Sequence, residues 1–256
     1  MLKVRVIPTL LWKQFGLVKG VGFDSWRRVG PVLPAIKVYN QREVDELILM
    51  DIVAHKDGEE PDYEAINDYG TDCFVPLTYG GGVYSADQVQ RLLRAGADKV
   101  SLNTAAFETP ELITQIAKRH GSQCVVASLD VRPLDDAHGR WRCYSRAGTY
   151  DTGRDAVDWA RQMEDRGAGE ILLTSIPCDG TFAGYDLDLI AAVTDAVSIP
   201  VIASGGAGSY QHMVDAVLQA KASAVAAASM FHFTEATPAE AKSVLSAAGI
   251  PTRASF

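Results

Sequence analysis

The sequence is poor in the patterns that mark disulfide frameworks, metal sites and membrane segments. Its four cysteines are widely scattered and form no C-x-x-C pair, so we expect reduced thiols. Its five histidines show no metal-ligand spacing with each other or with cysteine, so we expect no metal and no cofactor. No run approaches the about 18 apolar residues that a membrane helix needs, and Pro8 and Lys13 interrupt the apolar N-terminal stretch. These absences predict a cytoplasmic protein.

An excess of basic residues is also lacking, because 24 Lys and Arg stand against 32 Asp and Glu, a net charge of -8. This balance disfavours an extended nucleic-acid surface, which needs clustered Lys and Arg, but it permits a local anion pocket. Apolar residues are plentiful, at 47% of the chain with 22% charged, as in ordinary soluble proteins. The 256 residues match the usual length of a single α/β barrel.

Eight short apolar runs recur along the chain, and amphipathic segments separate them. The runs are almost continuously apolar, as in parallel strands that are covered on both faces. Segments such as 85–97, 109–121 and 152–169 have Ser or Thr at the start and Gly near the end, which is typical of helices. Eight such units predict one closed (β/α)8 barrel over residues 1–256. The strand candidates are residues 4–10, 46–52, 74–80, 98–102, 123–130, 170–176, 200–206 and 223–229.

The chain also repeats itself at about half its length. ELILMDI at 46–52 matches EILLTSI at 170–176, and Gly81 and Gly82 match Gly205 and Gly206, each at a separation of 124 residues. A duplicated half-barrel explains this spacing, and the alternative is chance similarity between strand–helix units. We predict half-barrels over approximately 1–122 and 123–256.

Glycine-rich turns follow several of the strand candidates. In a barrel the loops after the strands gather at one face, and glycine lets backbone N–H groups approach an anion there. One such turn alone would indicate only a tight connection, but each glycine pair has a small polar companion one unit further along. The pattern favours two phosphate sites on opposite sides, and therefore a substrate with phosphate at both ends. The predicted phosphate-binding residues are Gly81, Gly82, Asn103, Thr104, Asp179, Gly180, Thr181, Gly205, Gly206, Ala228 and Ser229.

Several motifs resemble the cyclase subunit of imidazole glycerol phosphate synthase. They include DELILMDI, YGGGVYS, RAGADKVSLNTAA and IASGGAG, and the resemblance covers essentially the whole chain. That family condenses ammonia with a bisphosphorylated ribulosyl substrate and closes an imidazole ring, with ammonia from a separate glutaminase subunit. The resemblance implies a heterodimer with such a glutaminase. It also implies Asp130 as a catalytic carboxylate and Lys19 as part of a mobile first active-site loop.

The resemblance further implies a charged gate for ammonia at the base of the barrel. Arg5, Glu46, Lys99 and Glu170 match the four gate residues, and Asp98 matches a residue that faces the glutaminase. Any one of them alone is explained as a solvated position at the start of a strand. The complete set favours a retained gate.

One position departs from the family pattern. The family has a second carboxylate after the first strand, where this sequence has Leu11. Leucine neither donates nor accepts a proton, and the loss of one acid–base partner costs about 10² to 10⁴ in rate. Cyclase-like proteins found with surface-polysaccharide genes resemble this chain in the apolar segment after the first strand. They are associated with the conversion of an acetamido sugar into an acetamidino sugar.

We therefore expect an ammonia-dependent synthase subunit that is specialised for amidation of a phosphorylated or nucleotide-linked sugar. The alternatives are the genuine histidine-pathway cyclase, a non-catalytic platform that activates a glutaminase, and a related sugar-phosphate isomerase barrel that would not need the gate.

Two features of the strand ends stay open on the sequence alone. Trp12, Phe15 and Trp26 in the first loop form either a lid over a ligand or packing against the barrel rim. Asp51, after the second strand, either orients neighbouring groups or partly replaces the missing carboxylate.

Overall fold

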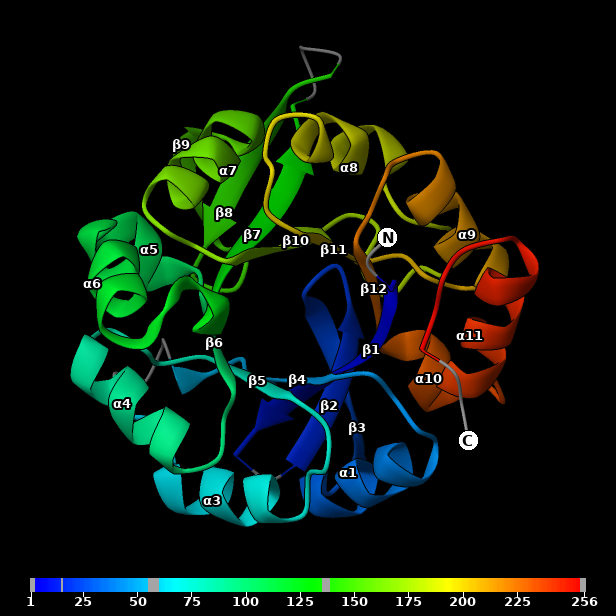
Figure 1. Cartoon of the computed structure of the whole chain (residues 1–256), viewed down its shortest axis with the longest axis horizontal. Coiled ribbons are helices and arrows are strands. Elements are labelled where there is room, and N and C mark those ends of the chain that lie inside the picture. The colour runs from blue at the N-terminus through cyan, green and yellow to red at the C-terminus, as the bar shows by residue number, and fades with distance from the viewer. Residues whose placement is uncertain (1–2, 15, 55–59, 135–138, 254–256) are drawn as a thin grey trace.

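Eight parallel strands close into a barrel in a computed structural model that describes residues 3–14, 16–54, 60–134 and 139–253. Each strand pairs with the next, and β10 pairs with β7 to complete the ring (Figure 1). The predicted barrel is confirmed. In ring order its strands are β1 (Arg5–Lys13), β4 (Leu47–Asp51), β5 (Leu77–Gly80), β6 (Lys99–Leu102), β7 (Val125–Pro133), β10 (Glu170–Ser175), β11 (Val201–Ser204) and β12 (Ala224–Ala227). Six strand candidates contain their strands, and β1 and β7 each continue three residues beyond the predicted end.

Helices surround the barrel and cover the outer face of its strands (Figure 1). The strands are apolar on both faces, so their outward side chains pack against the helices in one extended core. The helices are α1 (Val32–Gln41), α3 (Tyr63–Thr71), α4 (Ala86–Arg94), α5 (Thr104–Glu108), α6 (Glu111–His120), the 3-10 helix η1 (Ser122–Cys124), α7 (Ala156–Asp165), α8 (Leu187–Thr194), α9 (Tyr210–Leu218), α10 (Ser229–Phe233) and α11 (Pro238–Ala247).

Local capping explains where two of the expected helices begin. Helix α4 starts as predicted, because Ser85 and Gln88 form a capping box that satisfies the first free amides. Helix α7 starts later than the expected segment 152–169, because Asp155 accepts hydrogen bonds from two amides of its first turn. The residues before it are extended and belong to a strand.

Two antiparallel hairpins extend the barrel and were not predicted. Strand β1 pairs with β2 (Gly16–Val21), which pairs with β3 (Asp24–Gly30), and β7 likewise pairs with β8 (Trp141–Ser145), which pairs with β9 (Tyr150–Asp155). Strands β3 and β9 are largely exposed and lack the apolar runs that marked the others. The first strand of each predicted half therefore carries the same kind of extension.

The strand register repeats between the two predicted halves. Ile48 of β4 lies opposite Thr78 of β5, and Leu172 of β10 lies opposite Ile202 of β11, with 124 residues between the matching members. Ile48 and Leu172 also belong to a small apolar cluster inside the barrel. This cluster separates the two ends of the barrel, one of which holds a pocket and the other a ring of charges. No helix among the described residues is both long and apolar enough to cross a membrane.

Candidate functional site

A pocket opens at the carboxyl ends of the barrel strands, the end at which the βα loops gather. It collects residues from both predicted halves, so segments far apart in the sequence share one cavity. Its lining includes these predicted site residues: Leu11, Lys19, Gly81, Gly82, Asn103, Thr104, Asp130, Asp179, Gly180, Gly205, Gly206, Ala228 and Ser229.

Asp130 of β7 is held in the pocket wall by Asn103. The Asn103 amide nitrogen donates to Asp130 Oδ2 at 3.2 Å and to the backbone oxygens of Ser128 and Tyr144 at 3.1 Å each. Burial, with a further contribution from nearby Asp179, raises the pKa of Asp130 to about 7. Both protonation states are therefore populated near neutral pH, as a group that accepts and returns a proton requires.

Leu11 occupies the position in β1 that Asp130 occupies in β7. Leu11 lies opposite Met50 of β4, and Asp130 lies opposite Thr174 of β10, which is 124 residues after Met50. Strands β1 and β7 are four places apart in the ring of eight, so the two residues stand on opposite walls at the same level. Leu11 is partly exposed and lines the pocket. One wall therefore presents a carboxyl group where the other presents an alkyl group.

Lys19 of β2 pairs with Asp179, in the turn after β10 that lies directly beside it. Its Nζ donates to Asp179 Oδ2 at 2.6 Å and to the backbone oxygen of Gly20 at 3.0 Å, and its side chain is buried. Burial raises the pKa of Asp179, and the ammonium group of Lys19 opposes this shift. Asp179 thus holds Lys19 in place, and phosphate contact by Asp179 and the neighbouring Gly180 stays a prediction.

The two glycine turns are built alike. Gly81 has φ +111° and Gly205 has φ +86°, a region that residues with a side chain rarely adopt. A Cβ atom at Gly81 would lie 2.2 Å from the backbone oxygen of Asp51, and one at Gly205 would lie 2.6 Å from that of Ser175. Asp51 and Ser175 are themselves 124 residues apart. The repeat therefore requires glycine twice, for the same steric reason.

The helix ends around the pocket differ in how their first amides are satisfied. Helices α5 and α10 start directly after β6 and β12, and neither Asn103 nor Ala228 caps them with its side chain. Uncapped helix amides favour a bound anion. Helices α4 and α9 start four residues after their glycine pairs and are capped by Ser85 and Ser209. The glycine turns therefore present loop amides rather than helix ends.

Thr181 is the one predicted phosphate-binding residue that does not line the described part of the pocket. Its hydroxyl donates to the backbone oxygen of Cys178 at 2.7 Å and accepts from the Ala183 amide at 3.2 Å. The side chain therefore stabilises its own turn.

Asp51 lines the pocket, and one of its carboxylate oxygens is bound by the backbone that follows it. Its Oδ1 accepts hydrogen bonds from the amides of Val53 at 2.9 Å and Ala54 at 3.0 Å. This arrangement agrees with an orienting role better than with replacement of the missing carboxylate.

The aromatic residues of the first loop divide between the two predicted roles. Trp12 is buried and packs edge-on against Tyr69 outside the barrel, with ring centroids 5.7 Å apart. Trp26 lines the pocket, and so does Phe23, which the sequence did not single out. Phe15 lies outside the described residues. The loop therefore packs on the rim through Trp12 and faces the cavity through Trp26 and Phe23.

The tips of the two hairpins meet over the pocket. A Cβ atom at Gly148, in the β8–β9 turn, would lie 3.0 Å from the ring of Phe23 in the β2–β3 turn. The Arg146 amide donates to Thr104 Oγ1 at 3.0 Å, and Ala147 lines the cavity. Arg146 and Ala147 both have φ +53°, a conformation that neither residue type signals in the sequence. This turn was therefore not predicted from the sequence.

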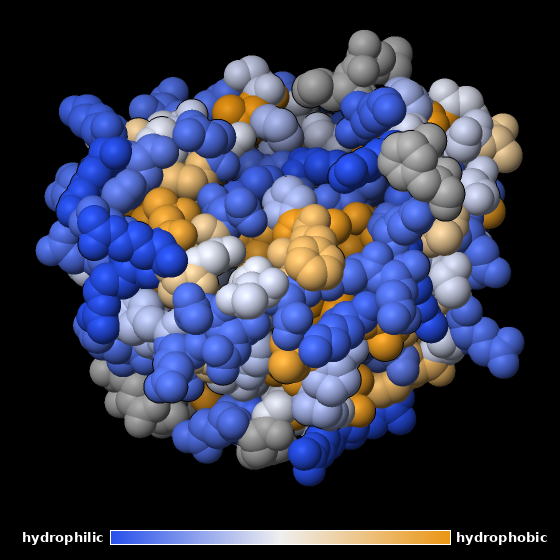
Figure 2. Space-filling view, turned by 60° about the horizontal axis from the view of Figure 1, so that its bottom comes forward, coloured by the Kyte–Doolittle hydropathy of each residue, from blue (hydrophilic) through white to orange (hydrophobic). Residues whose placement is uncertain are grey.

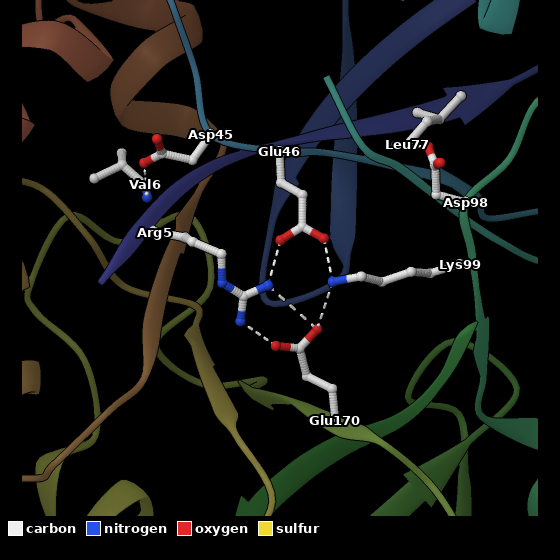
Figure 3. A network of polar contacts seen from close by, with 8 residues as sticks. All are labelled: Arg5, Val6, Asp45, Glu46, Leu77, Asp98, Lys99 and Glu170. Atoms are coloured by element: carbon white, nitrogen blue, oxygen red, sulfur yellow. Dashed lines mark hydrogen bonds and ion pairs between the residues drawn. The ribbon is translucent and has the colours of Figure 1, made fainter. Parts of the chain in front are cut away.

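At the opposite end of the barrel, four charged side chains form a closed ring (Figure 3). Arg5 pairs with Glu46 and Glu170, and Lys99 pairs with the same two carboxylates, at 3.0 Å to Glu170. Both glutamates are buried, and alternating charges let each residue satisfy two neighbours. The four predicted gate residues thus lie together at the amino ends of the strands, and gating by them stays a prediction.

Two aspartates beside the ring tie neighbouring strands together (Figure 3). Asp45 Oδ2 accepts from the Val6 amide and Asp98 Oδ2 accepts from the Leu77 amide, both at 2.9 Å. Asp98 is nevertheless exposed on this face. Its predicted contact with a partner stays a prediction.

Between the ring and the pocket, two buried hydroxyls lack a hydrogen-bond partner among the described residues. They are Thr9 Oγ1 and Ser101 Oγ, and both residues line the pocket. A buried hydroxyl without a partner is costly unless a small polar molecule reaches it. No group of three or more His, Cys, Asp or Glu side chains within the described ranges could hold a metal ion.

Comparison with known proteins places this geometry in context. A family model described as "Histidine biosynthesis protein" matches residues 5–237. Two relatives named "Imidazole glycerol phosphate synthase subunit HisF", from the NA1000 / CB15N and ATCC 19089 / CIP 103742 / CB 15 strains of Caulobacter vibrioides, are each 47% identical over 253 residues. The matches cover 99% of this chain and 97% of each relative.

Proposed function

Because the chain belongs to the histidine biosynthesis protein family and is a HisF-like cyclase subunit, we propose that it transfers ammonia to a sugar in an amidation reaction. The acceptor is a phosphorylated or nucleotide-linked acetamido sugar of surface-polysaccharide biosynthesis. Ammonia attacks the amide carbon, a carbon–nitrogen bond forms, and the carbon–oxygen bond breaks. The oxygen leaves as phosphate after activation of the amide by a nucleoside triphosphate, and the attacking nitrogen loses a proton. The product is an acetamidino sugar.

Leu11 is the observation that carries this proposal. It lines the pocket at the level of Asp130, so the two opposite walls offer one carboxyl group instead of two. Imidazole ring closure requires proton donation and proton abstraction, which two carboxylates can divide. Amidation needs proton transfer at one centre and no ring closure. Asp130, with a pKa near 7, suits that single role.

The ring of charges supports an ammonia supply from the far end of the barrel. Arg5, Glu46, Lys99 and Glu170 close the amino end, and an apolar cluster lies above them. Neutral ammonia is small and can cross an apolar interior that excludes hydrated ions. We infer that a glutaminase subunit docks on this face in a heterodimer and delivers ammonia through the ring.

The two predicted phosphate sites, which lie on opposite sides of the pocket, agree with an acceptor that has two anionic ends. The first site combines the Gly81–Gly82 turn with the uncapped start of α5, and the second combines the Gly205–Gly206 turn with that of α10. A bisphosphorylated molecule or the diphosphate of a nucleotide sugar has this charge distribution.

The assay that tests the proposal supplies ammonium salt to the chain and compares two acceptors. We expect an amidine product from an acetamido nucleotide sugar with a nucleoside triphosphate, and no imidazole product from the bisphosphorylated ribulosyl substrate. Leu11→Asp should restore some ring closure, and Leu11→Asn, which has the same shape without the acid, should not. Robust imidazole formation by the unaltered chain would sink the amidation proposal.

The second candidate function is the genuine cyclase of histidine biosynthesis. The identity to the Caulobacter vibrioides HisF subunits over nearly the whole chain favours it. Ring closure would then proceed with Asp130 as the carboxylate on one wall and no acid at Leu11. The same two-acceptor assay separates this candidate from amidation.

A further inference from the structure

We propose that the wall formed by Leu11 of β1 and Met50 of β4, called here the apolar wall, is a binding site for a small alkyl group on the reacting carbon of the acceptor. The methyl group of an acetamido substituent is the chemical class that fits. The inference rests on the proposed function for the identity of the acceptor. It goes beyond that function by assigning a specificity role to residues that carry no catalytic group.

The asymmetry between the two predicted half-barrels first indicates this site. Met50 and Leu11 are neighbours in the β1–β4 register, and their counterparts Thr174 and Asp130 are neighbours in the β7–β10 register. All four residues line the pocket. The repeat has therefore kept polar groups on one wall and has placed two alkyl side chains on the other. A bound molecule meets opposite chemistry on its two sides.

The packing of Met50 keeps the apolar wall in place. A Cβ atom at Gly80 would lie 2.6 Å from the sulfur of Met50 and 2.8 Å from its methyl carbon, so Met50 rests directly on the backbone of β5. Leu172 belongs to the cluster inside the barrel, against which Met50 also packs. The wall is thus continuous with the barrel core and has few ways to move aside.

The opposite wall determines which part of the acceptor faces the alkyl side chains. Asp130 is oriented by Asn103 and is the carboxyl group to which the proposed function assigns proton transfer, so the reacting carbon must lie near it. A substituent that projects from this carbon away from Asp130 then meets Leu11. A hydroxyl group there would lose its water hydrogen bonds without gaining a partner. The transfer of a methyl group from water to this apolar surface has a favourable free energy.

The size of the effect follows from the burial of one methyl group. Each buried CH₂ or CH₃ group contributes a factor of about three to five in affinity. The acceptor should therefore be selected against its formamido analogue, which lacks only this methyl, by about fourfold. Polar substitution of the apolar wall should abolish or invert the preference.

The experiment measures binding without catalysis, so it is independent of ammonia and of any glutaminase. Calorimetric titration of the full chain uses two probes, UDP-N-acetylglucosamine and UDP-N-formylglucosamine, which differ by one methyl group. We expect the acetyl probe to bind about fourfold more tightly to the unaltered chain and to Leu11→Met. We expect equal or inverted affinities for Leu11→Asp, with thermal unfolding of each variant as the folding control.

Equal affinities for the two probes in the unaltered chain, or failure of both to bind, overturn the inference. A methyl preference that Leu11→Asp leaves unchanged also overturns it, because the apolar wall is then not its source. A methyl preference that depends on Leu11 supports the apolar wall. If the two-acceptor assay then gives no amidine, only the amidation proposal fails. The two proposals can therefore fail separately.

Discussion

Asp130 shows how strongly the setting of a single residue alters its chemistry. An aspartate in water is ionised at neutral pH, but burial in the barrel wall moves the pKa of Asp130 from 3.8 to about 7. Asn103 donates to the carboxyl group and holds it in one orientation. The residue is therefore poised to exchange a proton, at the expense of some stability of the fold.

Replacement of Asp130 by Asn tests both consequences. A carboxyl with a raised pKa keeps its proton in the folded chain where the unfolded chain has lost it, so stability falls as the pH rises from about 4 to about 7. Asp130→Asn removes this dependence. We expect the variant to be more stable than the unaltered chain at about pH 8 and equally stable below about pH 4. The gain in free energy of unfolding at about pH 8 is at most about 1.4 kcal/mol for each unit by which the pKa is raised.

Ammonium-dependent turnover of the same variant should fall by about 10² to 10⁴. Urea unfolding across the pH range and initial rates with ammonium salt provide the two measurements. If the variant retains full turnover while its complex with the glutaminase persists, Asp130 is not catalytic, and the alternative of a non-catalytic platform gains support.

At the scale of elements, the two hairpins decide how the pocket is covered. The β2–β3 hairpin brings Lys19 to Asp179 and Phe23 to Gly148, and the second contact joins it to the β8–β9 hairpin. Gly148 has φ +76°, and the ring of Phe23 already lies at close range. The absence of a side chain at Gly148 allows the two tips to meet.

Gly148→Val should therefore displace the β2–β3 hairpin from its contact with the β8–β9 turn. The matched control is Gly153→Val, because Gly153 also has a positive φ, +72°, but has nothing within 4 Å of an added Cβ atom. We expect limited trypsin digestion to cut at Arg27 and Arg28 several times faster in Gly148→Val than in Gly153→Val. Equal cutting rates in the two variants would show that backbone strain, and not the contact with Phe23, governs the hairpin.

At the scale of the whole molecule, the barrel separates an exposed face with a charged ring from a pocket at the other end. The surface in Figure 2 is mostly hydrophilic, with a cluster of apolar side chains in its middle. Phe74 lies in the segment between α3 and β5, on the side of the strands' amino ends, and is 81% exposed. A large exposed aromatic side chain is typical of a residue that a partner covers.

Phe74→Asp should therefore weaken the complex with the glutaminase by about fivefold or more, because an aromatic anchor at an interface often contributes about 1 kcal/mol or above. Tyr150→Asp is the control, because Tyr150 is an aromatic residue that is 55% exposed at the start of β9, at the pocket end of the barrel. Analytical ultracentrifugation or interferometry gives the dissociation constants. Equal effects of the two substitutions would argue against docking on the gate face.

Much of the barrel could be predicted because its signals are local. An apolar run such as EILLTSI indicates a buried strand by itself, and Ser85 with Gln88 marks the start of α4 within four residues. The hairpin strands β3 and β9 escaped prediction because most of their side chains face solvent, which leaves no apolar pattern to read. The paired pocket glycines Gly81–Gly82 and Gly205–Gly206 could be singled out because the repeat displays the pair twice.

The sequence by itself determined the number and order of the barrel strands, the 124-residue repeat and the residue types that reach the strand ends. Only the tertiary structure decided which of those residues face one another. Closure of the ring by β7 and β10 sets Leu11 against Asp130 across the pocket and brings Arg5, Glu46, Lys99 and Glu170 into one ring. Strand register joins residues over a hundred positions apart, and it depends on packing around the whole barrel, which no local pattern encodes.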